Sequence, residues 1–277
     1  MNPFETQLFQ KAIEHWWNSK ASKTSKKTQG GTRDDNLSGK TMDGFAAAIR
    51  DFLVSLNVQP AHIFSGSHLC TTPSILPSYF RPSKNWDVVV LANSRFHPAE
   101  GDSGSPVLYA AVEFKSQDKS IGNNQNNRME ESIGNAHDFW TTYSNSGFER
   151  QQPRPWLGYL FVGKYAPAAD SKAVKIRQPH FLALPPFRTA GSENVPTFNG
   201  PSYAERYHMF LKQSVGARLY DAGAFVVTDE EIKNKIPNYR ILFPEFGPTF
   251  FLRSLKAHIL SHYPGALIKP GGFASQI

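Results

Sequence analysis

An acidic and a basic side chain stand two residues apart at the end of a long apolar run. The run starts at Val107 and ends in Glu113, Phe114 and Lys115. Because side chains alternate across a β-strand, Glu113 and Lys115 should lie on one face and Phe114 on the other. A carboxylate and an ammonium in this position are either a catalytic pair or an ion pair at a strand end.

A second carboxylate, Asp87, lies at the start of another apolar run, Trp86 to Ala92. The segment between the two runs, Asn93 to Pro106, is rich in Gly, Ser, Pro and Asp, which is typical of turns. We therefore expect the two runs to be a hairpin or near neighbours. If they pair antiparallel, the start of the first lies beside the end of the second, and Asp87 and Glu113 converge.

This trio predicts a particular chemistry. Two carboxylates and the carbonyl of Phe114 are oxygen ligands of the kind that Mg²⁺ prefers. Phosphodiester hydrolysis needs a nucleophilic water, a Lewis acid and a cation that faces the developing charge. Lys115 would orient or deprotonate the water and offset that charge. The alternative is that Asp87 caps a strand while Glu113 and Lys115 form only a surface pair.

The composition favours a globular protein with a polyanionic partner. The 277 residues are 40% hydrophobic, which suits one domain over 1–277, and the net charge of +7 suits DNA. The single cysteine, Cys70, cannot form an internal disulfide and favours a reducing cytoplasm. We expect no membrane partner, because no uncharged apolar stretch approaches the roughly 20 residues that span a bilayer.

Hydrophobic periodicity predicts an α/β fold with one central sheet flanked by α-helices. Further strands are expected over 156–163 and 222–227. Helices are expected over 41–56, 203–220 and 250–263. Two more helices are expected to begin at capping residues: one runs from a cap at Asn2 to Trp17, and one begins at a cap at Asn127. Residues 19–40 form a basic, polar tract that would be a flexible linker or a DNA-contacting arm.

The polar segment after the apolar run that ends in Lys115 could contact base edges. Asn and Gln can bond adenine, and Arg and Lys can bond guanine. The candidates are Gln117, Lys119, Asn123, Asn124, Asn126, Asn127 and Arg128. The alternative is a flexible loop that ends at Asn127 as a helix cap. Asp43 is either an extra metal-binding acid or a complement to a helix dipole, and Glu130 and Glu131 are expected to cap or lie at the surface.

Two stretches around Lys115 resemble a known family. They are Val112-Glu113-Phe114-Lys115-Ser116-Gln117 and the run from Gly122 to Gly134, and the resemblance continues at Met42 to Phe45, Trp86 to Val89, Trp156 to Tyr159 and Leu219 to Ala222. All resemble the XhoI-type restriction endonucleases of the PD-(D/E)xK nuclease superfamily. One departure is Trp86, which stands where the motif has Pro.

The resemblance implies a restriction-endonuclease-like core with a mixed sheet. It also implies that Asp87 and Glu113 bind metal and that Lys115 is the motif lysine. A homodimer would cut double-stranded DNA at CTCGAG, with Mg²⁺ as cofactor and 5′-phosphates as products, and a prokaryotic companion methyltransferase would protect the host. A structure-specific or repair nuclease and a non-catalytic DNA-binding protein remain the alternatives.

Overall fold

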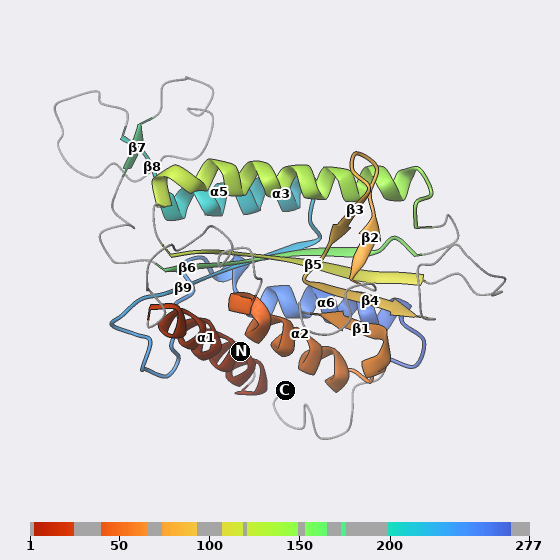
Figure 1. Ribbon diagram of the computed structural model, residues 1–277, viewed down its shortest axis with the longest axis horizontal. Coiled ribbons are helices and arrows are strands. Elements are labelled where there is room, and N and C mark those ends of the chain that lie inside the picture. The colour runs from red at the N-terminus through yellow and green to blue at the C-terminus, as the bar shows by residue number, and fades with distance from the viewer. Residues whose placement is uncertain are drawn as a thin grey trace.

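A five-stranded sheet runs through the middle of the molecule (Figure 1). The computed structural model describes residues 3–24, 40–65, 74–92, 107–118, 121–148, 153–164, 173–175 and 199–266. The sheet has the order β1-β4-β5-β6-β9. Its strands are β1 (Ile63–Ser65), β4 (Val88–Ala92), β5 (Val107–Gln117), β6 (Trp156–Lys164) and β9 (Ala222–Thr228).

The sheet is mixed, as the family resemblance implied. β1 and β4 pair antiparallel, as do β4 and β5, whereas β5, β6 and β9 run parallel to one another. Smaller elements surround it: the hairpin β2 (Ile75–Pro77) and β3 (Ser83–Asn85), the pair β7 (Ala173–Lys175) and β8 (Asn199–Ser202), and the 3₁₀ turns η2 (Lys40–Met42), η3 (Pro60–His62) and η5 (Pro244–Phe246).

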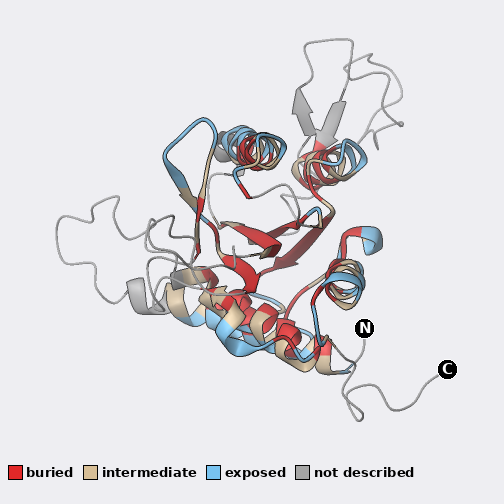
Figure 2. Cartoon of the chain, turned by 90° about the vertical axis from the view of Figure 1, so that its right-hand side faces the viewer, coloured by how far each residue is buried: buried red, intermediate tan, exposed pale blue. Residues whose placement is uncertain are grey.

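Helices cover both faces of the sheet. On one face lie α1 (Pro3–Thr24), α2 (Asp43–Ser55) and α6 (Pro248–His262), and on the other lie α3 (Ile121–Ser144) and α5 (Tyr203–Gly216) (Figure 1). The strands are almost wholly buried between these layers, and the helices expose only their outer sides (Figure 2). Each face therefore has its own hydrophobic core, which explains why the central strands are nearly uninterrupted apolar runs.

The predicted helices and strands are present, with substantial errors at the end of α1 and the start of α3, and the predicted cap at Asn2 lies outside the described residues. α3 begins at Ile121, so Asn127 lies inside the helix and is not its N-cap. The Asn-rich start has weak intrinsic helix propensity, but tertiary contacts hold it. Gln125 is fully buried and donates to the carbonyl of Tyr203 at 2.7 Å, while Arg206 donates to Gln125 at 3.0 Å. The start of α5 thus fixes the first turns of α3.

Other boundaries differ by a few residues. β5 continues to Gln117, and α5 ends at Gly216 instead of near Tyr220. The basic tract 19–40 begins inside α1, which reaches Thr24, and 25–39 lies outside the described residues. None of the helices in the described part of the chain is long and apolar enough to cross a membrane.

Candidate active site

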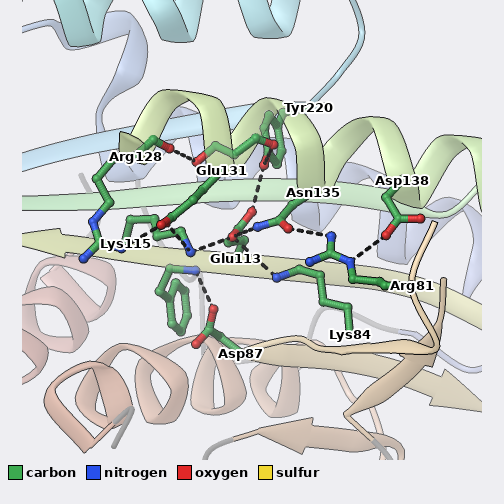
Figure 3. Close-up of polar contacts among 12 residues, drawn as sticks. Arg81, Lys84, Asp87, Glu113, Lys115, Arg128, Glu131, Asn135, Asp138 and Tyr220 are labelled. Atoms are coloured by element: carbon green, nitrogen blue, oxygen red, sulfur yellow. Dashed lines mark hydrogen bonds and ion pairs between the residues drawn. The ribbon is translucent and has the colours of Figure 1, made fainter. Parts of the chain in front are cut away.

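The antiparallel pairing of β4 and β5 brings Asp87 beside the end of β5. Val88 pairs with Val112, and the amide of Asp87 donates to the carbonyl of Val112 at 3.2 Å. The Asp87 carboxylate then accepts a hydrogen bond from the amide of Phe114 at 2.7 Å, through Oδ2 (Figure 3). The side chain of Asp87 therefore extends the hydrogen bonding between β4 and β5 beyond the last main-chain pair, and the predicted convergence with Glu113 is confirmed.

Glu113 is buried, with 1% of its surface exposed, and its carboxylate contacts polar groups of four side chains through ion pairs and hydrogen bonds (Figure 3). Oε1 lies 3.0 Å from Nζ of Lys115, 3.5 Å from Nζ of Lys84 and 2.5 Å from Nδ2 of Asn135. Oε2 accepts from the hydroxyl of Tyr220 at 2.9 Å. These donors come from β5, β3, α3 and the loop before β9, so the carboxylate is held from several sides.

Strand alternation places the motif residues as expected. Glu113 and Lys115 lie on the same face, since their charged groups are 3.0 Å apart. Phe114 lies on the other face, where 6.3 Å separates the centroid of its ring from that of Phe45 on α2. The apolar ring thus anchors β5 in one core while its neighbours point toward α3.

The two carboxylates have opposite electrostatic environments. Burial raises the pKa of Asp87 to about 6, and the hydrogen bond from Phe114 offsets only part of this effect. Burial would also raise the pKa of Glu113, but Lys84 and Lys115, with hydrogen bonds from Lys115 and Tyr220, hold that pKa below its ordinary value. Glu113 is consequently ionised at neutral pH.

The two lysines differ as well. Burial would lower the pKa of Lys115, yet its contact with Glu113 raises that pKa above the ordinary value. For Lys84 burial dominates, and its pKa is lowered despite the attraction of Glu113. Lys84 also lies over the ring of Trp86, with 4.5 Å between Nζ and the ring centroid. Sequence patterns gave no sign of Lys84.

A chain of hydrogen bonds extends from Glu113 along α3 (Figure 3). Arg81 donates from Nη2 to Oδ1 of Asn135 at 2.7 Å, and from Nε to Oδ2 of Asp138 at 2.7 Å. Because Oδ1 of Asn135 is engaged by Arg81, its amide nitrogen faces Glu113. Sequence reasoning missed Asn135, Asp138 and Tyr220, although Tyr220 lies within a stretch that resembles the XhoI type.

The donor set fits a divalent metal ion. Asp87, Glu113 and the carbonyl of Phe114 offer hard oxygen ligands, and Glu113 is held ionised. Asp87 uses Oδ2 for the Phe114 amide, so Oδ1 is the oxygen left for coordination. A cation bound there would also offset the burial that raises the pKa of Asp87.

Asp43 is the first residue of α2. Within the described residues, no group of three or more His, Cys, Asp and Glu side chains is arranged to hold a metal ion. Of the other acids considered, Glu130 is exposed at the surface, whereas Glu131 pairs with Arg128 at 3.0 Å and with Lys115 at 3.6 Å. Glu131 therefore links the start of α3 to the site.

The predicted base-contacting residues fall into three groups. Gln117 is buried, with 5% exposed, and its Oε1 accepts from the hydroxyl of Tyr207 at 2.7 Å, so its side chain does not face the surface. Asn126, Asn127 and Arg128 lie in the second turn of α3, and the two asparagines are exposed. Asn123 and Asn124 lie in the first turn, and their side chains, like all of Lys119, lie outside the described residues. Residues 121–128 are therefore the start of a helix and not a loop.

Comparisons with known proteins agree on one family. The family model described as Restriction endonuclease XhoI matches residues 20–239. The chain is 33% identical to the Type II restriction enzyme BstVI of Geobacillus stearothermophilus over 83% of this chain and 91% of that protein. It is 36% identical to the Type II restriction enzyme AbrI of Azospirillum brasilense, over 71% and 80% of the two chains.

A third relative is the Type II restriction enzyme XhoI of Xanthomonas vasicola, with 32% identity over 73% of this chain and 72% of that protein. No solved structure matches the chain. The relatives decide among the three alternatives that the sequence left open, in favour of a site-specific deoxyribonuclease. The chain belongs to the XhoI restriction endonuclease family.

Proposed function

We propose that the chain cuts double-stranded DNA at the palindrome CTCGAG in a Mg²⁺-dependent reaction that leaves 5′-phosphates. The observation that carries the catalytic part is the convergence of Asp87, Glu113 and Lys115 at the end of β5. The target sequence rests on family membership, since one relative is named XhoI. Residues Asn123, Asn124, Asn126, Asn127 and Arg128 at the start of α3, with Lys119 before it, remain the candidates for base contacts.

Asp87, Glu113 and the Phe114 carbonyl would hold the ion. When bound, Mg²⁺ supplies a Lewis acid for the phosphate and lowers the pKa of a water. Lys115 would orient the attacking water, and its Nζ holds a positive charge because Glu113 raises its pKa. Lys84 reaches the same carboxylate oxygen from β3 and brings a second cation to the face where charge develops on the phosphate.

A palindrome is best met by a twofold dimer, with one active site for each strand. We therefore propose a homodimer in the cytoplasm of a prokaryote. A companion methyltransferase would modify the same sequence in the host DNA, without direct contact to this chain. The basic tract 19–40 would serve as a DNA-contacting arm: Lys20, within α1, already lies 2.8 Å from Asp118, directly after β5.

A digest of a long DNA of known sequence tests the proposal. With Mg²⁺, discrete fragments whose ends map to CTCGAG and carry 5′-phosphates are expected. A smear would point to a structure-specific or repair nuclease. Discrete fragments that end at another sequence would retain the enzyme class and overturn the target. Sedimentation of the protein with and without a CTCGAG duplex tests the dimer.

A further inference from the structure

The turn between β2 and β3 presents two aromatic rings to solvent beside the active site. In residues 78–82, Tyr79 is 56% exposed and Phe80 is 64% exposed. Aromatic side chains contribute large apolar areas, and adjacent exposed rings on a folded protein often mark a binding surface. Figure 1 shows the β2–β3 hairpin rising past the sheet toward α3.

The turn is held in a defined conformation. Oδ1 of Asp138 accepts from the amides of both Tyr79 and Phe80, at 2.8 and 3.1 Å. Oδ2 of the same carboxylate accepts from Nε of Arg81 at 2.7 Å. The Tyr79 and Phe80 rings meet edge to face at 5.0 Å, and the Phe80 ring stacks on His137 of α3 at 5.7 Å. The rings are therefore presented on a rigid support.

This surface is continuous with the catalytic carboxylate. Arg81 donates to Asn135, and Asn135 donates to Glu113, so two hydrogen bonds link the turn to the site of chemistry. A duplex that places a phosphate at Glu113 would have Arg81 within reach, because only the side chain of Asn135 separates the two residues. Asp138, the acid nearest to the rings, is already neutralised by Arg81, whose side chain stays 41% exposed. The pair is neutral overall, but its exposed member is the guanidinium, because the Asp138 side chain is only 4% exposed, and a guanidinium at the surface can donate to a phosphate.

We propose that Tyr79, Phe80 and Arg81 form a DNA-contacting surface next to the scissile phosphate. The two rings pack against deoxyribose and base edges, and the exposed part of the Arg81 guanidinium donates to a phosphate. This inference rests on the proposed function, because it takes double-stranded DNA as the partner. It adds a contact outside the α3 segment and names the residues that make it.

Tyr79→Ala and Phe80→Ala, singly and together, test the surface. Binding to a CTCGAG duplex is measured by fluorescence anisotropy with Ca²⁺ in place of Mg²⁺. We expect the double variant to bind about tenfold more weakly or worse, by loss of aromatic contacts. Phe250→Ala is the matched control: Phe250 is 51% exposed and belongs to α6, on the opposite face of the sheet. Its affinity should stay within twofold of the parent protein.

A direct contact map complements the affinities. A photoreactive phenylalanine analogue at position 80 should cross-link to DNA, and one at position 250 should not. Unchanged affinity of the double variant, or a cross-link from position 80 to a second copy of the chain, would overturn the inference. Failure of the unmodified protein to bind or cut the duplex would instead overturn the proposed function, so the two failures are distinguishable. Thermal melting confirms that these exposed substitutions leave the fold intact.

Discussion

Asp87 and Glu113 show how two neighbouring carboxylates acquire opposite ionisation behaviour. Glu113 is the more deeply buried of the two, yet its pKa is lowered, whereas the pKa of the partly exposed Asp87 is raised to about 6. The difference lies in the donors. Glu113 has two ammonium groups, an amide and a hydroxyl, whereas the hydrogen bond to Asp87 comes from one main-chain amide.

The depth of burial therefore does not set the ionisation of each carboxylate at this site; the arrangement of hydrogen-bond donors and ammonium groups does. Glu113 is ready to bind a cation before any metal arrives, because its charge is already stabilised. Asp87 would gain most from a bound metal, since its ionised form is penalised without one. If both bind the metal as proposed, the pair would divide the task between a preorganised ligand and a ligand whose ionisation is coupled to metal binding.

The largest effect should come from removing either carboxylate. Asp87→Asn and Glu113→Gln should each lower the single-turnover cleavage rate about 1000-fold or more, because each removes a charged metal ligand. Affinity for a CTCGAG duplex in Ca²⁺ should fall far less. Cleavage in Mg²⁺ that survives either change would show that the active site has been assigned to the wrong residues.

The same two variants should have opposite effects on the stability of the metal-free protein at pH 8. Asp87 binds its proton more tightly when folded, so its contribution to stability falls as pH rises from about 4 through about 6. Asp87→Asn keeps an acceptor for the Phe114 amide and removes this penalty. With about 1.4 kcal/mol per pH unit and some solvent contact, the gain is roughly 2 kcal/mol.

Glu113→Gln should instead destabilise by roughly 3 kcal/mol, because Lys84 and Lys115 lose the carboxylate that compensates their burial. The lowered pKa of Glu113 gives the corresponding sign: its contribution is present above its ordinary pKa and is lost as pH falls below that value. Urea unfolding in the presence of a chelator measures both variants. Changes of equal sign would contradict the contrast between the two carboxylates.

The trio could be predicted from sequence because each part of it is local. Strand alternation fixes the shared face of Glu113 and Lys115, and the turn-rich segment after Ala92 favours the antiparallel pairing that brings Asp87 beside them. The register of Val88 with Val112 confirms that expectation. The two apolar runs and their order in the chain were sufficient to predict that Asp87, Glu113 and Lys115 lie together.

The remainder of the site depends on tertiary packing that local patterns do not encode. Lys84 reaches Glu113 because a short hairpin folds over β5, and Asn135 and Tyr220 do so because α3 and the loop before β9 pack on the same face. The early start of α3 has the same cause, since Gln125 is fixed by Tyr203 and Arg206, which lie about 80 residues away.

Lys84→Met tests whether the second lysine contributes to chemistry as well as to the acidity of Glu113. We expect the single-turnover rate at saturating protein to fall about 10-fold to 100-fold, because one cation that faces the phosphate is lost. Lys164→Met is the control, because Lys164 also combines a carboxylate, Glu230 at 2.7 Å, with a tryptophan ring, Trp17 at 4.8 Å. Equal rates for Lys84→Met and the parent would make Lys84 a structural partner only.

The smallest effect on the saturated cleavage rate should come from Arg81, which, besides the proposed phosphate contact, acts on Glu113 through Asn135. Without Arg81, the Asn135 amide can turn its oxygen toward the carboxylate, so Glu113 loses a donor. Arg81→Ala should lower the saturated cleavage rate about threefold to tenfold and raise the Mg²⁺ concentration that gives the half-maximal rate. Arg81→Lys should restore part of the lost rate.

Arg154→Ala is the matched control for that change. Arg154 is 43% exposed against 41% for Arg81, and its partner Asp221 also accepts a main-chain amide, from Leu157 at 2.8 Å. Loss of a similar surface pair should leave the Mg²⁺ dependence unchanged. If Arg81 acts only through Asn135, adding Arg81→Ala to Asn135→Ala should not lower the saturated rate further. A further loss of the full threefold to tenfold would show that Arg81 influences the reaction independently of Glu113.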